Sequence, residues 1–173
     1  AVRIERLEFV FPGDDVRVGI NLEDPLGSLE TGGFDLVILY DTNLTLQAVS
    51  AGQFISNCGW EYFAHTQIGA YEVRVTAIAD LNNGSAHPSC FGATAAELAE
   101  LHFNTPLNLN LIGEFLSVRF KWHDCGDNGV SSKLGDTLYL SDQVFHFDGE
   151  LEYEITLDTT FPSLHGAPAQ CDP

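Results

Sequence analysis

The sequence predicts an all-β protein that folds as a single-domain β-sandwich or jelly roll. About ten short runs alternate apolar and polar residues, and turns rich in Gly, Pro, Asn and Asp separate them. No long stretch repeats its apolar residues with a helical period, and no linker or internal repeat divides the chain. A length of 173 residues suits one domain, so we expect a single unit over residues 1–173, with a possible exchange strand at 1–11 and a Pro-rich tail at 161–173.

Residues 32–49 predict the central strand of the fold and the strand that follows it. The second face of the first run is apolar at Val37 and Leu39 as well, which is typical of a strand in the middle of a sheet with both faces covered. Turn chemistry at 41–43 then separates this strand from a second alternating run that starts at Leu44. The apolar residues on the first face of the central strand are Phe34, Leu36, Ile38 and Tyr40.

The rest of the chain predicts further strands and little helix. Thr94 and Glu97 have the spacing of a helix capping box, which predicts at most one helical turn before a strand that ends at Phe103. Residues 125–135 are rich in turn formers and are expected to form a loop. The apolar alternation of residues 2–11 changes phase near Arg6, which predicts either a bulge or an N-terminal arm followed by a separate strand. The other expected strands cover residues 16–22, 57–63, 71–79, 116–122, 138–140, 144–147 and 151–157.

The charge balance excludes several classes of partner. Seven Lys and Arg against 25 Asp and Glu give a formal net charge of −18, which repels polyphosphates and disfavours nucleic acid and anionic membranes. The chain has no run of 18 apolar residues, so membrane insertion is not expected. The same negative surface is compatible with Ca²⁺, and one loop contains four candidate oxygen ligands for this ion, although their spacing does not fit an EF-hand: Asp124, Asp127, Asn128 and Asp136.

Four cysteines indicate an extracellular disulfide framework. They contain no C-x-x-C pair, which makes zinc ligation unfavourable, and their even number on an acidic chain without Met is typical of a secreted protein. Three connectivities are possible, and the alternative is free buried thiols. The cysteines are Cys58, Cys90, Cys125 and Cys171.

The sequence contains candidates for two further kinds of site. Asn43 and Asn83 begin N-x-[S/T] sequons in expected turns, so covalent glycans are possible at both. Glu150, Glu152 and Glu154 share one face of a strand, as the acids of a jelly-roll glycosidase would. A solvated strand face has the same pattern, and we predict no enzymatic activity, no catalytic residue and no cofactor beyond a possible Ca²⁺.

Several segments together resemble the cohesin modules of bacterial surface proteins, which receive dockerins. The resemblance covers most of the chain from Gly32 onward, and the order and spacing of its pieces carry it. It implies a nine-stranded sandwich that binds protein through a sheet face or assembles on surfaces. The segments are GGFDLVILYD at 32–41, CGWEYF at 58–63, the loop at 82–90, ELA at 97–99, CGDN at 125–128, GDTLY at 135–139 and GAP at 166–168.

Three functions follow as hypotheses. The first is a non-enzymatic extracellular building block of a surface filament, in which the apolar segment at 2–11 completes the sheet of another copy; the alternative is that this segment is the first strand of its own chain. The second is a receptor module that binds a dockerin-like protein on the face bearing the central strand or its neighbour. The third is a carbohydrate-binding module that stacks sugars on Trp60, Tyr62 or Trp122. The self-association candidates are Val2, Ile4, Leu7, Phe9 and Phe11.

Overall fold

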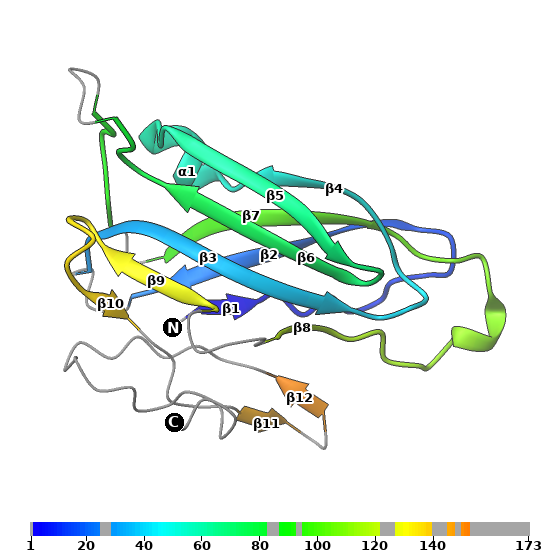
Figure 1. The fold of residues 1–173 in the computed structure, drawn as a ribbon. Helices are drawn as coiled ribbons and strands as arrows, with labels where there is room; N and C mark the ends of the chain where they lie inside the picture. The colour runs from blue at the N-terminus through cyan, green and yellow to red at the C-terminus, as the bar shows by residue number, and fades with distance from the viewer. Residues whose placement is uncertain are drawn as a thin grey trace.

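Two antiparallel β-sheets pack face to face, as the sequence predicts (Figure 1). The computed structural model describes residues 2–24, 29–82, 87–92, 95–121, 127–139, 145–147 and 150–152, with the backbone alone for the strands beyond residue 137. In these ranges helical structure is confined to α1 (Gln53–Cys58) and the 3₁₀ turn η1 (Leu109–Leu111). No helix there is long and apolar enough to cross a membrane. The all-β sandwich is confirmed.

Sheet A has four strands, and its long inner strands carry the alternation seen in the sequence. Val18, Ile20 and Leu22 of the second strand face the core, while Arg17, Gly19 and Asn21 alternate with them. In spatial order the strands are β1 (Val2–Ile4), β2 (Asp15–Glu23), β7 (Ala95–Asn104) and β4 (Thr45–Ala51).

Sheet B is built around β3 (Thr31–Tyr40), the strand that is apolar on both faces. Its neighbour on one side is β6 (Glu72–Ile78), which pairs next with β5 (Tyr62–Gly69). On its other side β3 pairs first with β9 (Gly129–Ser132) and then with β8 (Val118–Phe120), and β10 (Leu138–Tyr139) pairs with β9. The predicted central position of this strand is confirmed. A separate two-stranded ribbon joins β11 (Phe145–Phe147) and β12 (Glu150–Glu152).

The N-terminal segment forms the first strand of its own sheet over only three residues. Val2 and Ile4 pair with Leu22 and Ile20 of β2, and Val2 is fully buried. Of the self-association candidates, these two are therefore committed to their own chain, whereas Leu7, Phe9 and Phe11 lie on the surface outside any strand. The strand ends at Ile4, close to the change of phase expected near Arg6, and the separate strand expected after it does not form at residues 7–11. Glu5 is the last residue bound to β2, through its amide to the Gly19 carbonyl at 2.8 Å.

Two local expectations are wrong, and a third is met by a strand alone. The strand expected at 57–63 begins only at Tyr62, because α1 occupies residues up to Cys58. The segment expected to hold at most one helical turn before a strand to Phe103 is continuous strand from Ala95 in its described part. The loop expected at 125–135 contains β9, which pairs with β3.

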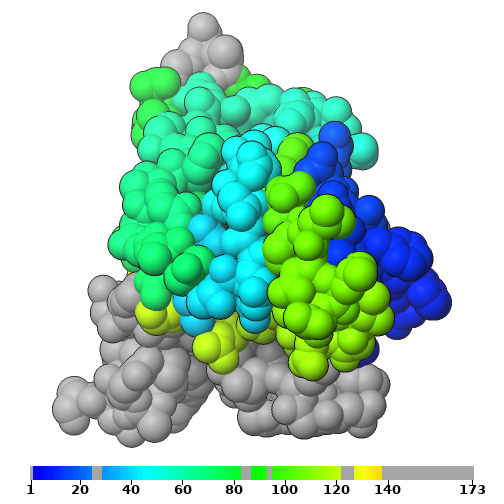
Figure 2. All heavy atoms as spheres, turned by 90° about the vertical axis from the view of Figure 1, so that its right-hand side faces the viewer, coloured from blue at the N-terminus to red at the C-terminus, as the bar shows by residue number. Residues whose placement is uncertain are grey.

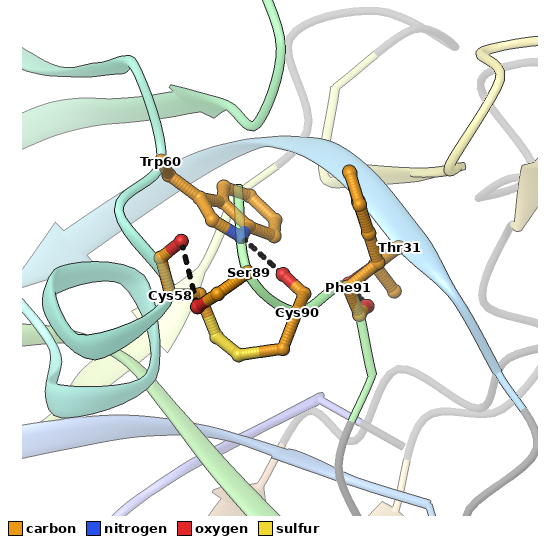
Figure 3. The surroundings of a disulfide bond; sticks show 6 residues. All are labelled: Thr31, Cys58, Trp60, Ser89, Cys90 and Phe91. Atoms are coloured by element: carbon orange, nitrogen blue, oxygen red, sulfur yellow. Dashed lines mark hydrogen bonds between the residues drawn. A yellow bond between two sulfur atoms is a disulfide. The ribbon is translucent and has the colours of Figure 1, made fainter. Parts of the chain in front are cut away.

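One disulfide fastens α1 to the loop that precedes β7 (Figure 3). Cys58 and Cys90 form it, and they lie 32 residues apart in the sequence. The Trp60 indole N–H donates to the Cys90 carbonyl at 3.2 Å, and the Ser89 amide donates to the Cys58 carbonyl at 2.8 Å. The bond therefore lies in a corner that hydrogen bonds hold from both sides. Cys125 and Cys171 lie outside the described residues.

Candidate functional site

The face of sheet B that points away from the core is the best candidate for a binding surface. On β6 the residues Val73, Val75 and Ala77 face the core, so the residues that alternate with them face outward. Val37 is fully buried yet lies outside the core cluster, because it belongs to this outer side of β3. We call this surface the outer face of sheet B; it comprises Asp35, Val37, Leu39, Tyr62, Ala64, Thr66, Ile68, Glu72, Arg74, Thr76 and Ile78, with Lys121, Asp127 and Asn128 at its β8–β9 side.

Charged side chains cross the strands of this face in a connected row. Arg74 of β6 lies 3.5 Å from Asp35 of β3 and makes a second ion pair with Asp127, whose side chain is 1% exposed. The Thr76 hydroxyl donates to the same Asp35 carboxylate at 2.8 Å. Because each carboxylate has a cation beside it, this face is close to neutral on a chain of charge −18. Lys121 and Glu72 form one more pair across the strands.

Asn128 closes the gap where β8 and β9 separate along the edge of β3. Its side-chain oxygen accepts the Val37 amide at 2.8 Å, and its side-chain nitrogen donates to the Lys121 carbonyl at 2.8 Å. The residue is 1% exposed and has a positive φ of 59°. Asn tolerates this left-handed conformation better than most residues. The Asn128 side chain thus makes the hydrogen bonds that the backbone of a neighbouring strand would otherwise make at this point of β3.

Replacing Asn128 tests this bridge. We expect Asn128→Gly, which keeps the left-handed backbone, to lower the free energy of unfolding by about 2 kcal/mol, since a buried N–H and a buried carbonyl lose their partner. Asn128→Ala is expected to cost about 1 kcal/mol more, because alanine adds the left-handed strain. Urea unfolding of the two variants measures the loss of the hydrogen bonds (in Asn128→Gly) and the added backbone strain (the difference between the two variants). Equal losses of stability in both variants would show that the left-handed backbone adds no strain to alanine here.

Apolar side chains flank the charged row toward the edge strand β5. Tyr62 is 39% exposed and Ile68 is 41% exposed, and Ile78 of β6 is half-buried beside Tyr62, its partner in the register. A surface that combines a rigid sheet, a neutral charge network and exposed apolar rings suits protein–protein contact. Two well-formed hollows of the described residues lie elsewhere, one beside β1 and one on sheet A.

A polar cluster on the outside of sheet A has the residue types of a hydrolase but not the geometry. Ser50 Oγ lies 3.1 Å from His102 Nε2, and Glu100 Oε1 lies 2.7 Å from the same nitrogen. A relay needs the two partners on opposite ring nitrogens, so that the carboxylate orients the base that serves the nucleophile. Because both contacts use Nε2, this arrangement supports a surface hydrogen-bond network and no nucleophilic catalysis.

The described residues among those expected to hold calcium have other partners. Asp127 pairs with Arg74, Asn128 bridges β8 and β9, and Asp136 accepts the Ser132 hydroxyl at 2.6 Å. Asp124 lies outside the described residues. Among the residues that are described, no group of three or more His, Cys, Asp or Glu is close enough to share a metal ion. Calcium binding stays a prediction.

The other candidate sites fall in different parts of the fold. Asn43 is exposed in the turn between β3 and β4, where its amide N–H donates to Asp41 at 2.8 Å, whereas Asn83 lies outside the described residues. Trp60 is only 9% exposed and packs against Phe34 and Phe54, so it offers no stacking platform for sugar. Trp122, Glu154 and the side chains of Glu150 and Glu152 lie outside the described part of the chain.

Sequence reasoning missed the charged row. The signal was present: Glu72, Arg74 and Thr76 alternate with valines, which marks them as one face of a strand. Thr76 and its partner Asp35 are 41 residues apart in the sequence, and Arg74 and its partner Asp127 are 53 apart. The strand order that brings them together is a property of the tertiary fold.

Comparisons with solved structures identify the class of fold. No family model and no curated protein sequence matches the chain. The sixth cohesin of scaffoldin B from Acetivibrio cellulolyticus, solved with a dockerin, superposes with a TM-score of 0.61 at 20% identity over 77% of this chain and 86% of that one. The OlpA cohesin of Clostridium thermocellum, also solved with a dockerin, gives 0.57 at 13% identity over 78% and 87%. A type III cohesin from the ScaE cell-surface anchoring scaffoldin of Ruminococcus flavefaciens gives 0.51 at 12% identity over 72% and 66%.

These likenesses define the chain as a cohesin-like β-sandwich. The resemblance inferred from its sequence segments is confirmed at the level of the fold. At identities of 20% and below, the comparison shows the architecture and leaves the partner to be argued from the surface of this chain.

Proposed function

We propose that this chain is a non-catalytic extracellular receptor module that binds a dockerin-like helical protein on the outer face of sheet B. The observation that carries the proposal is the composition of this face. A fully paired charge row lies beside the exposed Tyr62 and Ile68 on a rigid sheet. Two of the similar folds were solved with a dockerin bound, which supports the choice of partner.

The charge row favours a helical partner that brings both polar and apolar side chains. Because Arg74 already faces two carboxylates, a partner gains little from a single strong charge there. The gain comes from covering Tyr62 and Ile68 and from hydrogen bonds to the fixed row. An amphipathic helix laid across β5 and β6 satisfies both requirements.

The first hypothesis from the sequence, a filament donor strand at 2–11, has less support than this receptor function. Val2 and Ile4 are occupied in the sheet of their own chain, and donating them would leave the Leu22 and Ile20 positions of β2 uncovered. Self-association is not part of the proposed function.

Binding to dockerin modules tests the proposal. We expect at least one module in a panel that spans the known dockerin types to bind the purified chain in isothermal titration calorimetry. A Tyr62→Glu/Ile68→Glu double variant should weaken this binding by at least about 100-fold, since it places two charges where apolar contact is needed. The matched control is Gln47→Glu, an exposed position on β4 of the opposite sheet, which should bind like the unaltered chain.

Two results would contradict the proposal. One is the absence of binding across the whole panel. The other is binding that the double variant keeps and the Gln47→Glu control loses, which would move the partner to sheet A. Circular dichroism of each variant shows whether the β-sandwich itself is retained.

A further inference from the structure

Five large apolar side chains are exposed at one end of the sandwich. This end projects beyond the strands as the loop that contains η1, drawn in yellow-green on the right of Figure 1. Figure 2 looks onto this end and shows the N-terminal segment, in blue, beside that loop. We call the surface the apolar tip; it comprises Phe9 (87% exposed), Phe11 (68%), Leu107 (85%), Leu109 (71%) and Ile112 (68%).

Hydrogen bonds join the two segments of the apolar tip into one unit. The hydroxyl of the buried Thr105 accepts the Gly13 amide at 3.0 Å and donates to the Phe11 carbonyl at 3.0 Å. The Thr105 amide donates to the Asp14 carbonyl at 2.9 Å. A Cβ added to Gly13 would lie 3.2 Å from the Leu107 side chain, so the turn and the loop are in direct contact.

The loop is also fixed by its own hydrogen bonds. The Asn108 side chain accepts the Asn110 amide at 3.1 Å at the start of η1. The Leu111 amide donates to the Asn108 carbonyl at 3.1 Å. The Ile112 amide donates to the Leu109 carbonyl at 3.2 Å. Because these bonds restrain the loop before any contact forms, a partner pays little conformational entropy for ordering it.

The size of the apolar tip matches one half of a stable protein interface. At roughly 180 Å² for each fully exposed large residue, the five exposed fractions correspond to about 700 Å². The largest apolar patch of a typical monomer is about 300–600 Å². Two such tips in contact would bury about 1,400 Å², within the range of about 1,200–2,000 Å² that stable interfaces bury.

The charge of the chain indicates which partner suits the apolar tip. Residues 9–13 and 105–113 contain no charged residue, although the whole chain carries a formal charge of −18. A surface without charges has no charge pattern by which a different protein would be selected, but it is complementary to itself. Contact end to end also keeps the acidic bodies of two copies far apart, which limits the repulsion between them.

We propose that the apolar tip is the interface of a symmetric homodimer. Two copies meet end to end about a two-fold axis, so that each copy covers the tip of the other. No strand is exchanged between the copies, which distinguishes this contact from the strand donation expected from the sequence. Phe9 and Phe11 take part through their side chains, outside any strand.

Analytical ultracentrifugation of the full chain over a range of concentrations tests the proposal. We expect a monomer–dimer equilibrium in which Leu109→Asp raises the dissociation constant at least about tenfold, since each dimer receives the new carboxylate twice. Leu107→Asp is a second variant with the same expected result. The matched control is Leu134→Asp, which adds the same charge at an 82% exposed leucine in the β9–β10 turn and should change the constant by less than about twofold.

Ionic strength gives an independent measurement of the same equilibrium. Added NaCl screens the repulsion between two copies of charge −18, so the dimer of the unaltered chain should become stronger as the salt concentration rises. An interface built from ion pairs would become weaker under the same change. A dimer that weakens with salt would therefore contradict contact through an uncharged tip.

Three further outcomes would overturn the proposal. The first is a monomeric mass at every concentration. The second is a dimer whose dissociation constant is unchanged in both Leu109→Asp and Leu107→Asp, which would place the interface elsewhere. The third is a monomer that sediments with phosphatidylcholine vesicles and loses this binding in Leu109→Asp, which would make a lipid surface the partner. Circular dichroism checks the fold of each variant, and dockerin binding is measured separately, so failure here leaves the receptor function standing.

Discussion

Replacing Cys58 and Cys90 together with alanine is expected to lower the free energy of unfolding by about 3.5 kcal/mol. The disulfide closes a loop across 32 residues of sequence, and losing it returns conformational freedom to the unfolded chain. The closed loop includes β5 and β6, and the bond fastens the end of α1 to the segment that leads from β6 to β7. Urea unfolding followed by circular dichroism, in the double variant and the unaltered chain, measures the difference.

Reduction supplies the matched control for this prediction. The unaltered chain in excess dithiothreitol should lose at least as much stability as the double variant, since reduction removes the Cys58–Cys90 bond together with any bond between Cys125 and Cys171. The double variant should itself be unaffected by the reductant if this bond accounts for the effect. A loss of under about 1 kcal/mol in the double variant would show that the hydrogen bonds of Trp60 and Ser89 hold the corner without the cross-link.

Phe103→Ala is expected to cost about 4 kcal/mol, the largest effect of a single substitution in the core. The Phe103 ring is 1% exposed, and its centroid lies 5.2 Å from that of Tyr40 on the facing sheet. Truncation removes the transfer free energy of the ring and leaves a cavity between the two layers. Thermal and urea unfolding of the variant measure the loss.

Leu134→Ala is the control for the core substitution. Leu134 is 82% exposed in the turn between β9 and β10, so its truncation should change the stability by no more than about 0.5 kcal/mol. A comparable loss in both variants would indicate that burial does not govern stability in this sandwich. A Phe103→Leu variant, which refills much of the volume, should recover more than half of the lost stability.

The strands with strong alternation were predictable because their pattern is local. Phe34 to Tyr40 is apolar on both faces, and the structure places this strand in the middle of sheet B. Val16 to Leu22 has one wet face, and it forms β2 with that face away from the core. Side chains alternate across a strand whatever its neighbours are, so burial on one face is visible in the sequence.

The helix was not predictable from its own residues. Only six residues long, α1 is too short to be stable by propensity, and burial of Phe54, Ile55 and Cys58 stabilises it. Gly52 allows the chain to enter α1 in direct contact with the Glu97 backbone, where any side chain would collide. The left-handed Gly59 ends the helix, with its amide directed at the Ile55 and Ser56 carbonyls.

The spacing of Thr94 and Glu97 is typical of a helix start, but packing in the tertiary structure favours a strand in this segment. Ala96, Leu98 and Leu101 are buried in the core, and this burial outweighs the local preference for a helical turn. The Glu97 carboxylate still caps a helix start, since it accepts the Gln53 amide of α1 at 3.2 Å. The helix that the Glu97 side chain caps is therefore α1, which a different segment of the chain forms.

The sequence alone determined the sandwich class, the central strand and the acidic surface, because apolar periodicity and charge are local properties of the chain. Tertiary structure decided which cysteine pairs with Cys58, which carboxylates face Arg74 and which amide Asn128 receives. These features depend on the order in which strands pair, and residues that meet there are separated by 30 or more positions in the sequence. A short sequence pattern does not indicate which distant residue a side chain will contact. The proposed binding surface therefore follows from the pairing of the strands and not from any one segment of sequence.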